Sequence, residues 1–95
     1  MRIVWTASAR RDLITHFDYL ATRDPDAAIR MDDAIRSAIA RLTDFPNRGR
    51  PGRREATREL VVAHWPYVIV YVVRDATVAI LRILHTSQEW PPRDA

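Results

Sequence analysis

The first half of the chain carries the hydrophobic spacing of an amphipathic helix that starts at about Ser8 and ends near Thr22. Apolar residues recur every three or four positions, at Ala9, Leu13, Phe17, Leu20 and Ala21, which places them on one face of a helix. Thr6 or Ser8 is the expected N-cap, because a hydroxyl side chain can accept a hydrogen bond from a free N–H group of the first turn.

A second amphipathic helix is predicted to begin at Asp24-Pro25-Asp26 and to stop before Phe45-Pro46. Asp24 can cap this helix, and Pro25 suits the first helical position because an N–H there would have no helical partner. The apolar stripe consists of Ala28, Met31, Ile35, Ala38, Ile39 and Leu42. The short link between the two helices predicts an antiparallel helical hairpin over about residues 8–44.

The second half of the chain changes to the pattern of β-strands. β-branched and other apolar residues dominate Thr57–Ala63, Tyr67–Arg74 and Thr77–His85, so we expect a three-stranded antiparallel meander over about residues 57–85. The middle strand lacks polar alternation and should lie centrally, with one face under the helical hairpin. A second apolar face left exposed would favour association, which we take as a sign of a protein partner.

Together these segments predict a single domain, residues 1–95, of the α+β class. A short N-terminal strand at Arg2–Trp5 precedes the helical hairpin, which packs on the three-stranded antiparallel sheet. Residues 47–56 contain both glycines of the chain and form a loop between the last helix and the sheet. Residues 86–95 form a tail that contains one large aromatic residue, Trp90, which we expect either to pack onto the sheet or to be covered by a partner.

Positive charge is concentrated in that loop. All fifteen basic residues are arginine, and the net charge is +3. The segment from Arg48 to Arg58 carries five arginines and one acid, so its net charge is +4 and that of the remainder is −1. A GC-rich genome explains the absence of lysine but not this concentration. The loop has three possible roles: a solvated surface, contact with an acidic protein or antitoxin, or contact with nucleic acid.

Composition excludes several classes of function. A chain of 95 residues supports one modest core and no deep enclosed cavity, so we expect its action at a surface. The absence of cysteine excludes a disulfide scaffold, a zinc finger and a thiol nucleophile. No apolar run has the length of a membrane span or the position of a signal peptide. We therefore expect a cytoplasmic protein with no membrane partner, no metal and no cofactor.

Several short motifs, in this order of elements, resemble bacterial toxins of the RelE/ParE superfamily. In the helices and loop they are Asp12-Leu13, Tyr19-Leu20-Ala21, Asp24-Pro25, Phe45-Pro46 and Gly49-Arg50-Pro51-Gly52-Arg53. In the sheet and tail they are Thr57-Arg58-Glu59-Leu60-Val61, Pro66-Tyr67-Val68-Ile69-Val70-Tyr71, Ile80-Leu81-Arg82-Ile83-Leu84-His85, Gln88 and Trp90-Pro91. The resemblance covers nearly the whole chain, and the segment from Arg58 to Trp90 is more similar to the ParE branch than to the RelE branch.

The resemblance implies the toxin of a type II toxin–antitoxin module, which forms a hetero-oligomer with a cognate antitoxin. ParE-like members are associated with inhibition of DNA gyrase, whereas RelE-like members cleave mRNA in the ribosome. Antitoxins of such modules fold a flexible segment onto a groove of the toxin. Leu13, Phe17 and Leu20 are the candidates to line that groove, provided that they are not fully buried.

A ribonuclease would need a general base and cationic groups that stabilise charge on the phosphate. The resemblance matches His85, Arg58 and Arg82 to these roles, and only His85 has a pKa suited to a base. Regular strand alternation, however, places Arg82 on the same face as Val78 and Ile80, and His85 on the opposite face. We therefore assign no catalytic residue, and a ribosome-dependent mRNA endoribonuclease remains the alternative.

Arg82 needs either solvent or a carboxylate, because it lies within an apolar run. It could reach the open face of the sheet beside Arg58, or it could pair with a carboxylate such as Glu59 on a neighbouring strand. The favoured hypothesis is a surface that binds a protein target, made of Arg48, Arg50, Arg53, Arg54, Arg58, Arg82 and Trp90. A homologue that has lost toxicity and acts as a binding module would show the same motifs.

Overall fold

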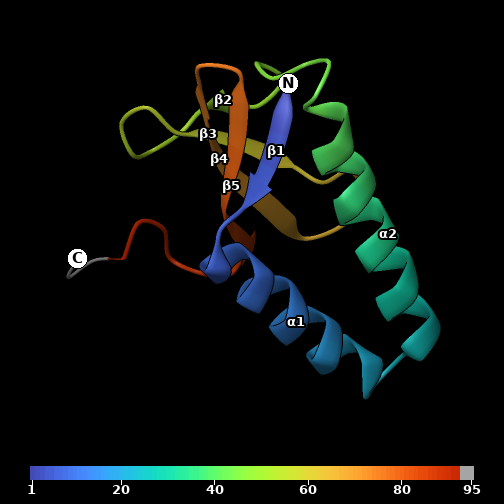
Figure 1. Ribbon diagram of the computed structural model, residues 1–95. Helices are drawn as coiled ribbons and strands as arrows, with labels where there is room; N and C mark the ends of the chain where they lie inside the picture. Colours follow the sequence, from blue (N-terminus) through green and yellow to red (C-terminus); the bar gives the residue numbers. More distant parts are fainter. Residues whose placement is uncertain (93–95) are drawn as a thin grey trace.

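The computed structural model of the chain describes residues 1–92 and has two layers, a helical hairpin and a β-sheet (Figure 1). The elements in chain order are β1 (Arg2–Trp5), α1 (Ala7–Ala21), α2 (Pro25–Arg41), β2 (Arg50–Pro51), β3 (Arg58–Val61), β4 (Tyr67–Arg74) and β5 (Thr77–His85). The predicted α+β class is confirmed, and 93–95, the end of the predicted tail, lie outside the described residues.

Within the described residues the sheet has five strands, in the order β1-β5-β4-β3-β2. β3, β4 and β5 form the predicted antiparallel meander. The predicted strand at Arg2–Trp5 is confirmed as β1, but the sheet was predicted with three strands and β2 was not predicted at all. β1 pairs in parallel with β5 along one edge, and β2, inside the predicted loop, pairs with Arg58 and Glu59 along the other. A strand of two residues is too short to leave a hydrophobic pattern in the sequence.

Both helices begin at the predicted caps. The side chain of Thr6 accepts a hydrogen bond from the backbone N–H of Ala9 at 3.1 Å, and Asp24 accepts one from Ala27 at 3.0 Å. α2 ends at Arg41, three residues before the predicted limit, and the chain continues through turns. Neither described helix is long and apolar enough to cross a membrane.

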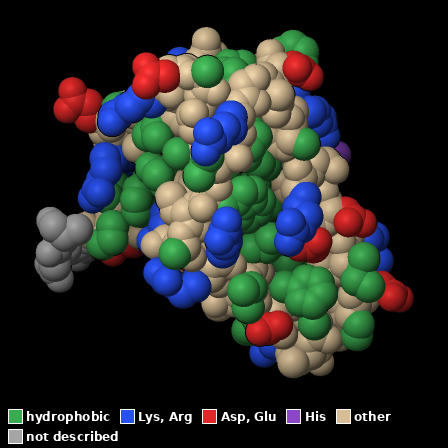
Figure 2. Space-filling model, viewed as in Figure 1, with side chains coloured by type: hydrophobic (Ala, Val, Ile, Leu, Met, Phe, Trp, Pro, Cys, Tyr) green, Lys and Arg blue, Asp and Glu red, His purple; other side chains and the backbone are tan. Residues whose placement is uncertain are grey.

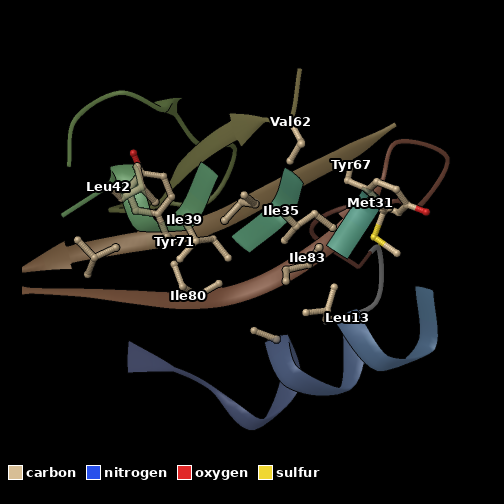
Figure 3. Packing of buried hydrophobic residues seen from close by; sticks show 13 residues of the cluster. Leu13, Met31, Ile35, Ile39, Leu42, Val62, Tyr67, Tyr71, Ile80 and Ile83 are labelled. Carbon is tan, nitrogen blue, oxygen red and sulfur yellow. The ribbon is translucent and has the colours of Figure 1, made fainter. Parts of the chain in front are cut away.

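The hydrophobic core lies between the hairpin and the sheet (Figure 3). Its fully buried side chains come from both layers and include Met31, Ile35, Leu42, Ile69, Tyr71, Ile80 and Ile83. Leu13 is the labelled contribution of α1 in the close-up view, and α2 supplies most of the helical side. The apolar stripe of α2 is therefore buried as its periodicity predicts.

Side chains of α1 and of its N-cap residue, Thr6, continue the hydrogen bonding of β5 where β1 ends. β1 stops at Trp5, and the hydroxyl of Thr6 then donates to the carbonyls of Ile80 and Leu81 at 2.8 and 3.0 Å. Further along, Asp12 accepts from the N–H of Ile83 at 2.9 Å, and Nε2 of His16 donates to the carbonyl of Ile83 at 2.8 Å. Helical side chains thus satisfy backbone groups that would otherwise form an open strand edge.

An irregularity in β5 determines which side chains face the helices. Arg82 pairs with Val70, but Ile80 pairs with Tyr71, so Leu81 is an extra residue at this point. The bulge puts both Ile80 and Ile83 in the core, three residues apart. The prediction that Arg82 shares a face with Val78 and Ile80 was therefore wrong. Arg82 lies on the open face of the sheet, the face opposite the helices.

Candidate functional site

Two arginines of the basic loop are held by one buried acid. Glu59 accepts hydrogen bonds from the side chains of Arg50 and Arg53, each at 3.1 Å, and from the backbone N–H of Arg53 at 2.9 Å. The side chain of Glu59 is only 1% exposed, while those of the two arginines are more than half exposed. Arg50 and Arg53 thus fold the loop onto β3 and still present part of their guanidinium groups to solvent.

The ionisation of Glu59 follows from these contacts. Burial acts to raise the pKa of this carboxyl group, but the hydrogen bonds from Arg53 and Arg50 favour the charged form and outweigh burial. The net result is a pKa below the ordinary value of a glutamate. Glu59 is therefore a carboxylate in the folded protein and a structural anchor for the loop.

A second anchor of the loop is the hydroxyl group of Tyr71. It accepts a hydrogen bond from the N–H of Gly49 and donates one to the carbonyl of Pro46, both at 2.8 Å. A Cβ atom at Gly49 would lie 2.8 Å from the Tyr71 ring, so glycine is required for this close approach. Arg58 also contacts the loop, because its guanidinium group donates hydrogen bonds to the carbonyls of Gly49 and Asn47. Arg58 is thus engaged in holding the loop.

Arg82 pairs with a carboxylate, as one of the two predictions required, but the partner is Asp12 of α1 and not Glu59. The guanidinium group donates to the two carboxylate oxygens of Asp12 at 2.7 and 3.0 Å. It therefore does not pair with Glu59, nor does it stand free beside Arg58. The hydrogen bonds that Arg82 donates to Asp12 raise the pKa of Arg82 above its ordinary value, so this side chain stays cationic. The pair joins the first helix to the last strand.

Trp90 folds back and covers part of the open face. It packs against Val70 and Leu84 and is 9% exposed. The guanidinium carbons of Arg54 and Arg82 lie 5.2 and 5.8 Å from its ring centroid, within the range of cation–π contact. Its buried indole N–H has no hydrogen-bond acceptor among the described residues. In this arrangement the predicted target-binding tryptophan faces the sheet instead of solvent.

The three residues matched to a ribonuclease site do not come together. His85 pairs across the sheet with Tyr67, on the helical side, whereas Arg82 pairs with Val70 on the open face. Arg58 is opposite Tyr71 of β4, whereas His85 is opposite Tyr67 of the same strand. These two positions of β4 are four residues apart, which is about 13 Å along a strand. Nδ1 of His85 is already hydrogen-bonded to the N–H of Ser87 at 3.1 Å. The prediction that alternation separates Arg82 from His85 is confirmed.

A groove of about 600 Å³ runs beside the helical hairpin. Leu13 and Phe17 of α1 line it as predicted, together with Ile14 and with Trp5 of β1. Leu13 is nearly buried, Phe17 is half-buried, and Ile14 is 60% exposed. The prediction for Leu20 was wrong, because Leu20 is half-buried, packs against the core and does not line this groove. Figure 2 shows apolar side chains gathered in a band down this face, bordered by arginines.

Arg48 is the remaining arginine of the predicted surface. It is exposed and, with Arg41, borders a small hollow of about 120 Å³ between α2 and β3. No ion pair of Arg48 occurs among the described residues. Over residues 1–92 no cluster of three His, Cys, Asp or Glu residues could hold a metal ion.

Three residues that shape these surfaces are not among the predicted site residues. Asp12 holds Arg82, and Trp5 and Ile14 help to line the groove. A signal for Asp12 existed, because Asp12 and His16 are polar positions one turn apart beside the apolar stripe of α1. Polar residues at such positions need partners on the element that the helix covers.

Known proteins similar to this chain are toxins and toxin–antitoxin complexes. Residues 3–90 match the family described as "ParE toxin of type II toxin-antitoxin system, parDE". The chain is 46% identical over 91 residues to Y4kP of Sinorhizobium fredii, covering 95% of this chain and 93% of that protein. It is 41% identical over 87 residues to "Toxin RelE2" of Caulobacter vibrioides, covering 92% of this chain and 97% of that protein.

Two solved structures have the same fold. A "Chromosomal ParDE TA system from P. aeruginosa" aligns with a TM-score of 0.81 and 26% identity, over 90% of this chain and 95% of that one. The toxin-antitoxin complex RelBE2 from Mycobacterium tuberculosis aligns with a TM-score of 0.62 and 29% identity, over 88% of this chain and 95% of that one.

Proposed function

The chain belongs to the ParE toxin family of type II toxin–antitoxin systems, and we propose that it inhibits growth by binding DNA gyrase. It is a toxin of the RelE/ParE superfamily. The observation that carries the choice of a protein target is the dispersal of the ribonuclease candidates. Arg58 and Arg82 make structural contacts, and the side chain of His85 lies on the opposite face of the sheet from that of Arg82. A ribonuclease needs these groups at one phosphate.

The groove beside the helical hairpin supports a cognate antitoxin as the second partner. Its apolar walls, Trp5, Leu13, Ile14 and Phe17, offer a long contact for the apolar face of an incoming segment, and Arg10, Asp18 and Arg36 border them. A flexible segment that folds on binding can cover such a groove and form a toxin–antitoxin hetero-oligomer. Ile14 is the most exposed apolar residue of this lining and so the first one to substitute.

One comparison of two assays tests the proposed target. We expect the purified toxin to inhibit DNA supercoiling by gyrase and to leave ribosome-bound mRNA intact. The cognate antitoxin should reverse the inhibition, and Ile14→Asp should weaken that reversal without loss of toxicity. Cleavage of mRNA that is abolished by His85→Ala would instead establish the ribonuclease alternative. A chain that does not slow growth at all would be a non-toxic homologue that only binds.

A further inference from the structure

The part of the open face that Trp90 leaves uncovered carries a row of two arginines with a threonine between them. β1 and β4 both flank β5, and the register places Arg2 opposite Thr77 and Thr77 opposite Arg74. Neighbouring strands are about 4.8 Å apart, so the Cα atoms of the two arginines are about 10 Å apart. Both side chains belong to exposed residues and can reach toward one ligand group above Thr77.

Alternation of the strands fixes the face on which this row lies. The neighbours Ile3, Val73 and Val78 pack against the core on the helical side. Arg2, Thr77 and Arg74 therefore point to the open face. The groove beside the hairpin lies on the helical side, so a partner on this row would not occupy the antitoxin groove.

The next row on the same face is apolar. Val4 is opposite Ala79, which is opposite Val72, and all three residues are half-buried. Small aliphatic side chains bordered by arginine form the usual anatomy of a protein-binding patch, with an apolar centre and a polar rim. Arginine is also among the residues that contribute most to binding energy in such patches.

No carboxylate of the described chain neutralises this row. The ion pairs of the described residues engage Arg36, Arg50, Arg53 and Arg82, and none engages Arg2 or Arg74. Asp75 lies in the turn between β4 and β5, has left-handed backbone angles and pairs with neither arginine. The two guanidinium groups thus remain available to an external acid.

We infer that the row Arg2–Thr77–Arg74, with the patch Val4–Ala79–Val72, binds an acidic surface of the toxin's protein target. This inference rests on the proposed function only in taking the target to be a protein. Arginine forks match carboxylates in a bidentate manner, and aliphatic side chains gain from contact with a protein surface. A nucleic-acid strand is less suited to the patch, because the patch offers no aromatic side chain on which bases could stack.

Paired substitutions with equal loss of charge test the row. Arg2→Ser/Arg74→Ser removes the two arginines, and the control Arg11→Ser/Arg30→Ser removes two exposed arginines of the helices. We expect the first variant to need at least about tenfold more toxin for growth arrest and gyrase inhibition, since arginine is among the residues that contribute most to binding energy. The control should match the wild type, and both variants should still bind antitoxin and melt at the wild-type temperature.

A third variant places an acid inside the row. Thr77→Glu puts a carboxylate between the two arginines, so it should also reduce toxicity without loss of folding. Full toxicity of Arg2→Ser/Arg74→Ser would overturn the inference, as would an equal loss in the Arg11→Ser/Arg30→Ser control, which would indicate net charge alone. If Arg2→Ser/Arg74→Ser, but not the control, loses binding to a fluorescein-labelled 20-nucleotide single strand, the ligand of the row is a nucleic acid and not an acidic protein.

The growth assay separates this inference from the choice of gyrase. If the wild type arrests growth but leaves supercoiling unchanged, the gyrase target is wrong. The comparison of the two arginine pairs in the same growth assay still decides whether the row binds the target.

Discussion

Arginines near the two ends of β5 differ in whether they are paired with a carboxylate. Near its C-terminal end, Arg82 is held by two hydrogen bonds to Asp12 and is partly covered by Trp90. At its N-terminal end, Thr77 lies between Arg2 and Arg74, and neither of these arginines has a carboxylate partner in the described chain. The residue type is the same at both ends. An arginine with a carboxylate within reach links a helix to a strand, whereas an arginine without one remains available to a binding partner.

The largest effect should come from removing the acid at the C-terminal end. Asp12→Ala leaves Arg82 without its partner and the N–H of Ile83 without an acceptor. Loss of one member of a buried pair costs about 3–5 kcal/mol, and partial exposure of this pair reduces the expectation to about 2–4 kcal/mol. Urea unfolding would measure it. Asp18→Ala, an exposed position of the same helix, should change stability by less than about 0.5 kcal/mol.

The basic loop provides the next test, because Glu59 holds Arg50 and Arg53 as Asp12 holds Arg82. Glu59→Gln keeps the shape but removes the charge, and we expect it to lower the unfolding free energy by about 2 kcal/mol at neutral pH. A stability equal to that of the wild type would show that the loop arginines are held by other contacts.

The same carboxylate gives the wild type a specific acid sensitivity. Its folded-state pKa is below the ordinary value of 4.5, so its contribution is complete above that value. The contribution disappears as the pH falls below 4.5 through the lowered folded-state pKa. Unfolding free energies measured from pH 6 to pH 3 should therefore converge for the wild type and Glu59→Gln. Parallel curves over this range would contradict the assignment.

A smaller loss is expected from Tyr71→Phe, which removes the hydroxyl between the N–H of Gly49 and the carbonyl of Pro46. Two loop groups then lose their partner, at a cost of about 1–2 kcal/mol. Amide hydrogen exchange should become faster at Gly49. The exchange rate of Ile69, in the fully buried part of β4, serves as the internal control.

The smallest effect on stability should come from the other end of β5. Arg2→Ser/Arg74→Ser removes two exposed side chains that make no ion pair in the described chain, so the unfolding free energy should change by less than about 0.5 kcal/mol. A larger loss in thermal or urea unfolding would show that these arginines stabilise the fold. The contrast with Asp12→Ala would then disappear.

The long elements could be predicted because their signals are local. The stripe of α2, the cap at Asp24 and the apolar run of β4 each extend over enough residues to fix an element and its buried side. β2 could not be predicted, since it pairs only two residues and one of them is proline. The loop predicted at residues 47–56 was thus correct except for this strand.

The environment of individual arginines was less predictable. Arg82 and Asp12 are 70 residues apart, and strand alternation gave a misleading neighbour set because Leu81 is an extra residue in β5. Glu59 is an acid on the strand next but one to Arg82 and so a plausible partner from the sequence, but it lies between the two loop arginines instead. Pairing of charges depends on tertiary distances, which hydrophobic periodicity does not encode.

The continuation of β1 by side chains of α1 has a consequence for how the toxin is made. Thr6, Asp12 and His16 all bond to Ile80, Leu81 or Ile83, so the docking of α1 depends on β5, which follows it much later in the chain. Contacts this distant in sequence form only when both partners are present. Docking of the first helix therefore has to wait until β5 has been synthesised, so the helical layer and the sheet can come together only late in the folding of the domain.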